Sequence, residues 1–152
     1  MKSNQIQTKI DGCNGLRVEI GGPTPDGYIL LNEMGVTLPE DIIVTNISNP
    51  VVLNPFGANP QTYEVDEVVD VNHLPYSAGE VCMMLASSLP NNLHKTLFKN
   101  AAKVVCEGGL LIIENELSDD LHIAEKYGFK PLLTSEISSR RYTQIYELLS
   151  LG

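Results

Sequence analysis

The stretch Leu16-Arg17-Val18-Glu19-Ile20-Gly21-Gly22-Pro23-Thr24-Pro25 decides how this chain is organised. Its apolar residues alternate at Leu16, Val18 and Ile20, which predicts a short strand. The two glycines follow at the carboxyl end of that strand, where they let the backbone turn sharply and approach a ligand closely. Glu19 beside such a turn can accept hydrogen bonds from amine or hydroxyl groups. An ordinary surface turn has the same pattern, so the rest of the chain must decide.

Length and composition predict one globular domain. The chain has 152 residues, of which 43% are hydrophobic and 19% charged, enough for a single core and too few for two ordinary domains. We expect a polar segment over residues 1–15, forming either an edge strand or a short cap, and one domain over residues 16–152. No apolar run is long enough to span a membrane, and no apolar signal region follows Met1, so we expect a cytoplasmic protein without membrane contact.

The net charge of −9 argues against nucleic acid as a partner, because a nucleic-acid footprint needs clustered Lys and Arg. Strong acidity suits a protein that holds a basic protein partner. Solubility is the simpler explanation of the same charge.

The cysteines and histidines indicate neither a disulfide framework nor a metal site. The three cysteines are an odd number, widely spaced and without a CxxC pair, and the histidines lie in separate segments. We expect two of the cysteines, Cys82 and Cys106, in the core because their neighbours are apolar. The residues concerned are Cys13, Cys82, Cys106, His73, His94 and His122.

Further strands are predicted by β-branched and apolar runs. They cover Asp41–Ile47, Glu64–Val71 (ending at Asp70), Gly79–Ser88 and Leu110–Ile113. Residues 26–36 fit a short helix or another strand. Residues 48–63 hold three prolines and are expected to form a loop.

Two helices and a hairpin complete the predicted elements. One helix starts near Pro90-Asn91-Asn92 and ends at Gly108 or Gly109, with apolar residues at helical spacing between. A second is capped by Ser118 and ends at Gly128. The last strands, Phe129–Leu133 and Tyr142–Leu149, are expected to pair as a hairpin.

This order of elements predicts an α/β domain with a mostly parallel sheet. Ligands bind such sheets outside the carboxyl ends of the strands, where the strand order reverses. We therefore expect the polar residues at those ends to converge, namely Glu19, Gly21-Gly22, Asn46, Asp70 to His73, and Ser87-Ser88.

Three motifs resemble the class I S-adenosylmethionine-dependent methyltransferases. Glu19-Ile20-Gly21-Gly22-Pro23 is similar to a variant first motif of that superfamily. Residues 70–76, Asp-Val-Asn-His-Leu-Pro-Tyr, resemble the acidic end of its third strand and the turn after it. Residues 102–113 look like its helix, Gly-Gly turn and fifth strand. The resemblance implies a Rossmann-like methyltransferase fold with a C-terminal antiparallel hairpin and reduced helical cover.

The resemblance also implies S-adenosyl-L-methionine as cofactor and a role for each matching residue. Glu19 and the Gly21-Gly22 backbone would hold its methionine part, and Asn46 a ribose hydroxyl. Asp70 would accept from the adenine amino group with Val71 packed beside it, and Ala86 and Ser87 would border the sulfur. His73 is the one candidate base for a methyl acceptor, and an exposed or capping histidine is the plainer interpretation.

The sequence departs from the family in ways that leave two hypotheses. The second strand ends in Thr45-Asn46 where the family usually has an acid, no acceptor-binding set follows Ser87, and the helical cover is short. One hypothesis is methyl transfer to a small-molecule or protein acceptor. The other is a methyltransferase-like protein without catalysis, such as a regulatory subunit or an acidic immunity or inhibitor protein for a basic partner.

Overall fold

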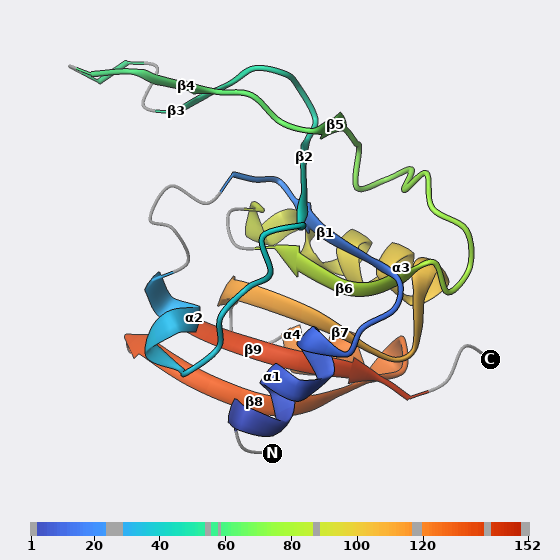
Figure 1. The fold of residues 1–152 in the computed structure, drawn as a ribbon. Coiled ribbons are helices and arrows are strands. Elements are labelled where there is room, and N and C mark those ends of the chain that lie inside the picture. The colour runs from blue at the N-terminus through green and yellow to red at the C-terminus, as the bar shows by residue number, and fades with distance from the viewer. Residues whose placement is uncertain are drawn as a thin grey trace.

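The computed structural model describes residues 3–23, 29–53, 56–57, 59–86, 89–116, 120–138 and 141–149. Its main sheet has seven strands in the order β5-β2-β1-β6-β7-β9-β8 (Figure 1). The first five of these pair in parallel, and β9 pairs antiparallel with both β7 and β8. The strands are β1 (Leu16–Ile20), β2 (Ile43–Asn46), β5 (Glu67–Val68), β6 (Val81–Ala86), β7 (Val105–Glu116), β8 (Phe129–Ser138) and β9 (Arg141–Leu148). The predicted parallel sheet with a C-terminal hairpin is confirmed.

Helices cover both faces of the sheet. On one face, α1 (Ser3–Asp11) and α2 (Ile29–Glu33) contribute Ile6, Ile10 and Leu31 to a buried cluster. On the other face, the 3-10 turn η1 (Asn91–Leu93), α3 (His94–Val104) and α4 (Asp120–Lys126) pack over a second cluster. Within the described residues, no helix is long and apolar enough to cross a membrane.

The N-terminal segment is a helix and not the edge strand that was one of the two expectations. Ile6 and Ile10 are four residues apart, so they lie on one face of α1, and both are fully buried. The segment is polar on average because its other residues face solvent. Its two aliphatic residues pack the helix against the sheet.

Residues 48–63 form more structure than the expected loop. β3 (Val51–Leu53) and β4 (Gln61–Tyr63) pair antiparallel and extend away from the main sheet (Figure 1). Pro50 and Pro60 each come just before a strand, where the missing N–H interrupts no ladder hydrogen bond. We call residues 51–63 the arm.

Two predicted boundaries are wrong for identifiable reasons. The helix expected to reach Gly108 ends at Val104, because the β-branched Val105 already pairs with Val81 of β6. The strand expected over residues 64–71 shrinks to β5. The Asp66 carboxylate accepts the Val44 N–H (2.8 Å), so a side chain takes the place of a backbone partner there.

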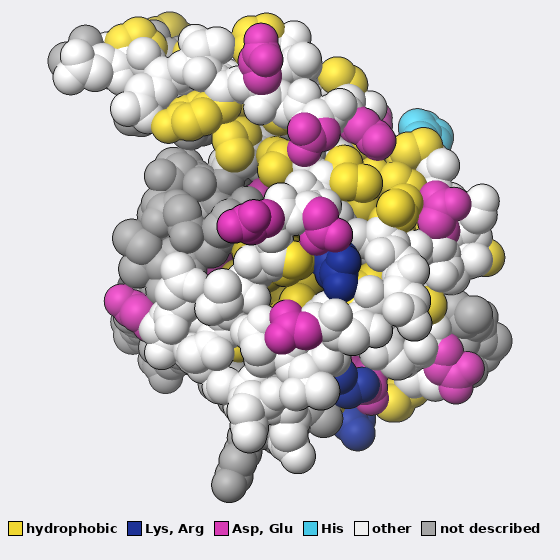
Figure 2. Space-filling model, viewed as in Figure 1, with side chains coloured by type: hydrophobic (Ala, Val, Ile, Leu, Met, Phe, Trp, Pro, Cys, Tyr) yellow, Lys and Arg dark blue, Asp and Glu magenta, His cyan; other side chains and the backbone are white. Residues whose placement is uncertain are grey.

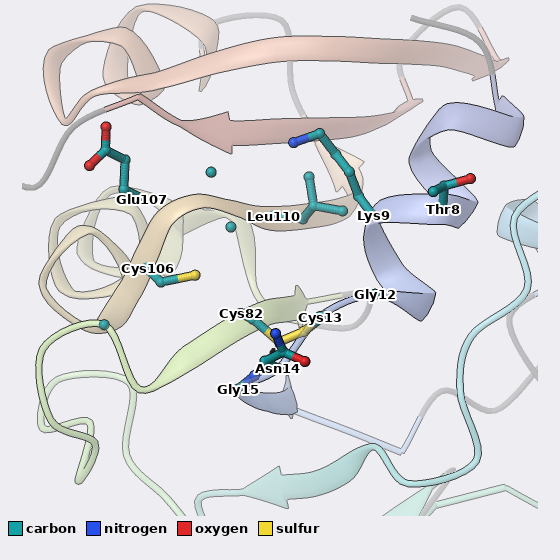
Figure 3. A pocket seen from close by; sticks show the side chains of 13 residues that line it. Thr8, Lys9, Gly12, Cys13, Asn14, Gly15, Cys82, Cys106, Glu107 and Leu110 are labelled. Carbon is teal, nitrogen blue, oxygen red and sulfur yellow. Dashed lines mark hydrogen bonds between the residues drawn. A yellow bond between two sulfur atoms is a disulfide. The ribbon is translucent and has the colours of Figure 1, made fainter.

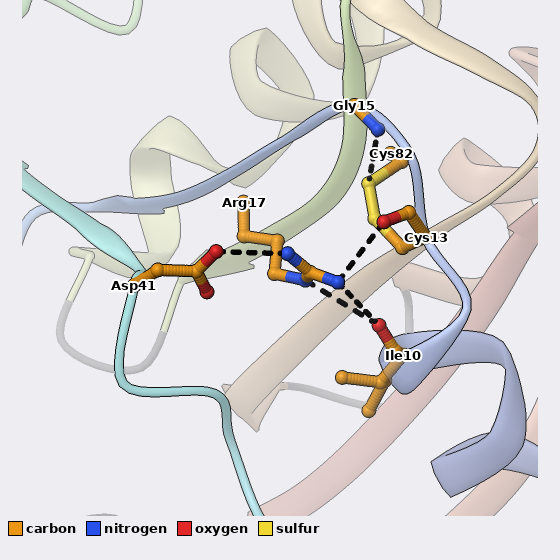
Figure 4. Close-up of polar contacts among 6 residues, drawn as sticks. All are labelled: Ile10, Cys13, Gly15, Arg17, Asp41 and Cys82. Carbon is orange, nitrogen blue, oxygen red and sulfur yellow. Dashed lines mark hydrogen bonds and ion pairs between the residues drawn. A yellow bond between two sulfur atoms is a disulfide. The ribbon is translucent and has the colours of Figure 1, made fainter.

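The cysteines also differ from expectation. Cys13 and Cys82 form a disulfide across 69 residues of sequence, and Cys106 is half-buried and free. A pair so distant in sequence leaves no spacing signal. Arg17 reinforces the same junction (Figure 4). Its guanidinium donates to the carbonyl oxygens of Ile10 (3.1 Å) and Cys13 (3.0 Å) and pairs with Asp41 (3.0 Å).

The aromatic centre of the core gives a test of this packing. Phe98 of α3 is fully buried and meets Tyr146 edge-on, with ring centroids 5.5 Å apart. We expect Phe98→Ala to lower the free energy of unfolding by about 3–5 kcal/mol, because transfer energy is lost and a cavity remains. Urea unfolding followed by circular dichroism measures this. The control Phe56→Ala removes a fully exposed ring and should change stability by less than about 0.5 kcal/mol. Equal losses in the two variants would contradict the packing.

Candidate functional site

A cavity of about 360 Å³ opens at the carboxyl ends of β1 and β2. In the sheet β1 lies between β2 and β6, so the strand order reverses there, and open α/β sheets bind ligands at such a point. Four residues predicted from the sequence line it: Gly21, Asn46, Asp70 and Val71. The remaining lining residues are Ile20, Ile47, Val69, Asn72, Leu89, Pro90 and Leu93.

The buried side chain of Glu19 packs against the turn that follows β1. A Cβ built on Gly22 would lie 2.6 Å from Cδ of Glu19, whose side chain is fully buried. Gly21 has φ of +77°, a left-handed conformation that glycine adopts without strain. The expected Glu19 is therefore packed under the turn and does not belong to the residues that line the cavity.

The end of β2 holds the same turn from the side. The Gly22 N–H donates to the Thr45 carbonyl (2.9 Å), and the Thr45 hydroxyl donates to the Glu19 carbonyl (2.6 Å). Asn46 Nδ2 donates to the Gly22 carbonyl (2.6 Å), while its Oδ1 accepts the Ile47 N–H (2.7 Å). Asn46 thus positions the turn as well as lining the cavity, a role that the sequence did not indicate.

Asp70 supplies the negative charge of the cavity wall. Its Oδ1 accepts from both the backbone N–H and the side-chain amide of Asn72 at 2.9 Å each. These two hydrogen bonds, backbone first, hold the pKa of Asp70 below its usual value, and the nearby His73 adds to the lowering. The carboxylate therefore stays ionised at neutral pH and can accept hydrogen bonds from a ligand.

Three other predicted residues are placed differently. His73 is exposed and lines a separate pocket with Tyr76 and Asn100, so it is not in the wall of the main cavity. Ala86 is fully buried at the end of β6. Ser87 lies outside the described residues.

Another part of the wall, beside Gly21, comes from the segment after β6, which sequence reasoning missed. A Cβ on Gly21 would lie 3.5 Å from Cδ1 of Leu89. The Leu89 carbonyl lies 3.3 Å from Nε2 of the buried His94, which must donate because a carbonyl only accepts. Nδ1 of His94 contacts Asp120 of α4 at 2.6 Å. The His94–Asp120 pair thus holds Leu89 in place. In the sequence, the only sign of this part of the wall is the apolar Leu89-Pro90 step just before a helix.

The arrangement can bind an amphipathic small molecule. Its lining offers the Asp70 carboxylate and the Asn46 amide together with apolar surface, which includes Leu89 and Leu93. No group of three or more His, Cys, Asp or Glu side chains that could hold a metal occurs in the part of the chain that the structure describes.

The role of Asn46 can be tested by restoring the acid that the family usually carries. In Asn46→Asp a carboxylate faces the Gly22 carbonyl and cannot donate to it. We expect a loss of about 1–3 kcal/mol in the free energy of unfolding, since a hydrogen bond is replaced by an unsatisfied acceptor. Urea unfolding measures it. Asn4→Asp, an exposed position in the first turn of α1, is the matched control and should be near neutral. An unchanged Asn46→Asp protein would show that the hydrogen bond does not hold the turn.

No protein-family model and no curated protein matches the sequence. Solved structures do match the fold. An antibiotic-resistance methyltransferase, Kmr, aligns with a TM-score of 0.53 and 13% identity over 98% of this chain and 94% of its own. A geranyl diphosphate C-methyltransferase from Streptomyces coelicolor A3(2), solved with Mg²⁺, geranyl diphosphate and S-adenosyl-L-homocysteine, aligns with a TM-score of 0.56 and 10% identity over 97% and 80%. A putative sarcosine dimethylglycine methyltransferase from Galdieria sulphuraria aligns with a TM-score of 0.59 and 12% identity over 97% and 83%. The resemblance is thus confirmed at the level of architecture, and the chain has the fold of the class I S-adenosylmethionine-dependent methyltransferases.

Proposed function

We propose that the chain binds S-adenosyl-L-methionine in the cavity between β1, β2 and Leu89 and transfers its methyl group to a small-molecule or protein acceptor. The observation that carries the proposal is the convergence of Gly21, Asn46, Asp70 and Val71 on one cavity at the switch point of a methyltransferase fold. These residues come from three separate segments of the chain.

Each residue has a role that its geometry supports. Asp70 accepts a hydrogen bond from the adenine amino group, with Val71 packed against the ring. The Gly21-Gly22 backbone approaches the methionine part, because a left-handed glycine leaves no side chain in the way. Asn46 faces the ribose, but both ends of its amide already hold protein partners, so it offers less than the usual acid. Glu19 acts as a positioning residue through Gly22.

Methyl transfer from this cofactor depends mainly on how the protein positions the acceptor. The sulfonium of the cofactor is already an activated methyl donor, so the protein must hold an acceptor nucleophile in line with it and exclude water. His73 lies outside the cavity wall and is exposed. We therefore assign no base among the residues that line the cavity.

Calorimetric titration of the purified protein with S-adenosylmethionine and S-adenosylhomocysteine tests the proposal. We expect micromolar binding of both, and Asp70→Asn should weaken it at least tenfold, about 1.4 kcal/mol, because a charged acceptor becomes a neutral amide. Glu64→Gln removes the same charge from an exposed position outside the cavity and should bind normally. The absence of heat at millimolar ligand, or equal losses in both variants, would contradict the proposed site.

A second function, binding a basic polypeptide without catalysis, is favoured by the distribution of charge. Residues 18–94 contain no Lys or Arg and hold ten of the nineteen Asp and Glu. The rest of the chain has ten basic and nine acidic residues, so the whole excess of negative charge belongs to this stretch. It includes the cavity and the arm. The same stretch also carries four exposed apolar side chains, Ile47, Val52, Phe56 and Val68. Figure 2 shows apolar side chains mixed with acidic ones on this part of the surface.

Binding of a decalysine peptide tests this second function. We expect an affinity that falls steeply between 50 and 200 mM NaCl, because the attraction of exposed charges is screened. Glu64→Lys, beside the arm, should weaken binding severalfold. Glu125→Lys makes the same change at an exposed position of α4 and should have a much smaller effect. Equal effects of the two variants would show that only net charge matters and would overturn a defined surface.

A further inference from the structure

A second cavity, of about 650 Å³, lies at the opposite end of the parallel strands, where β1 and β6 begin (Figure 3). Its wall contains all three cysteines of the chain, Cys13, Cys82 and Cys106. It also contains five glycines, which are Gly12, Gly15, Gly79, Gly108 and Gly109. Neither the fold nor the proposed methyl transfer uses this cavity.

One pair of these sulfurs is already joined. Cys13, just after α1, is bonded to Cys82 of β6, and their Cα atoms are 5.8 Å apart. The Gly15 N–H donates to Sγ of Cys82 at 3.3 Å.

The third cysteine, Cys106, lines the same cavity as the disulfide. Val81 pairs with Val105 on the neighbouring parallel strand, and both are buried on the α3 face. Cys82 and Cys106 are the next residues on those strands, and both line the cavity together with residues of α1. The pairing shifts register directly after these two valines: the next pair is Met83 with Leu110, so residues 106–109 lie opposite Cys82.

Glycines of the cavity wall lie close to the backbone of Cys82 and Cys106. A Cβ on Gly109 would lie 2.8 Å from the carbonyl oxygen of Cys106 and 3.1 Å from that of Cys82. A Cβ on Gly79 would lie 3.9 Å from Cβ of Cys106, and one on Gly108 would meet nothing within 4 Å. Glycines thus leave the space beside Cys106 open, and Figure 3 shows its sulfur pointing into the cavity.

We infer that the three cysteines form a thiol–disulfide exchange site in which Cys82 is the shared sulfur. The Cys106 thiolate attacks Sγ of Cys82, the Cys82–Cys106 bond forms as the Cys13–Cys82 bond breaks, and Cys13 leaves as a thiolate that takes a proton from water. The number of disulfides stays the same, so the step needs no oxidant or reductant.

The exchange changes what holds α1 on the sheet. With Cys13–Cys82 formed, the end of α1 is covalently tied to β6. After exchange the same end is held by the hydrogen bonds from Arg17 to Ile10 and Cys13 and by the packing of Ile6 and Ile10. A new thiol at Cys13 then faces the cavity and is open to modification.

Peptide mapping of the full chain tests the inference. Protein kept without reductant is unfolded in N-ethylmaleimide, which traps free thiols, and then digested with trypsin. The three cysteines fall in separate peptides, residues 10–17, 18–95 and 104–126. We expect two linked products, 10–17 with 18–95 and 18–95 with 104–126, and label on both Cys13 and Cys106. Label on Cys106 alone, with only the first product, would overturn the exchange.

Single substitutions show which sulfur is shared. Cys13→Ser, reoxidised with oxidised glutathione, should form Cys82–Cys106, and Cys106→Ser should retain only Cys13–Cys82. Cys82→Ser should form no disulfide, with Cys13 and Cys106 both labelled. A Cys13–Cys106 link in Cys82→Ser, or free Cys82 and Cys106 in a folded Cys13→Ser protein judged by circular dichroism, would contradict Cys82 as the shared sulfur.

Discussion

The packing of the buried Glu19 side chain against the α-carbon of Gly22 is the constraint on which the candidate site depends. A side chain at position 22 would meet the carboxyl end of Glu19, so Glu19 in this position requires a glycine there. The backbone of the turn is then close enough to β2 for Thr45 and Asn46 to bond to it. The ends of β1 and β2 thus form one continuous wall of the cavity.

The parts of the fold that were predictable are those where one local pattern decides the structure. β1 alternates polar and apolar residues, and β6 is apolar and buried throughout, so both strands could be located from sequence. The arm was not, because Pro50 and Pro60 argue against regular structure although they lie just outside its strands. α1 was uncertain because two isoleucines among polar residues fit a helix or a strand end, and only the sheet beneath them decides.

The candidate site also has a part that the sequence predicts and a part that it does not. Gly21, Asn46, Asp70 and Val71 were expected to converge because they end neighbouring parallel strands, a rule that topology alone supplies. The part of the wall that Leu89 supplies could not be foreseen, since Leu89 is held by His94 and Asp120 from two different helices. The Cys13–Cys82 bond was missed for a related reason. It joins positions that only the completed sheet brings together.

The two outer strands of the sheet have a consequence for self-association. Open strand edges invite pairing with another chain. On one side the outer strand β5 has only two residues, too few to template a ladder. On the other side β8 is ten residues long, but it carries Pro131, which has no N–H to donate, and the exposed Lys130 beside it. The β5 edge is therefore a poor template for edge-to-edge aggregation because of its length, and the first part of β8 because of its chemistry.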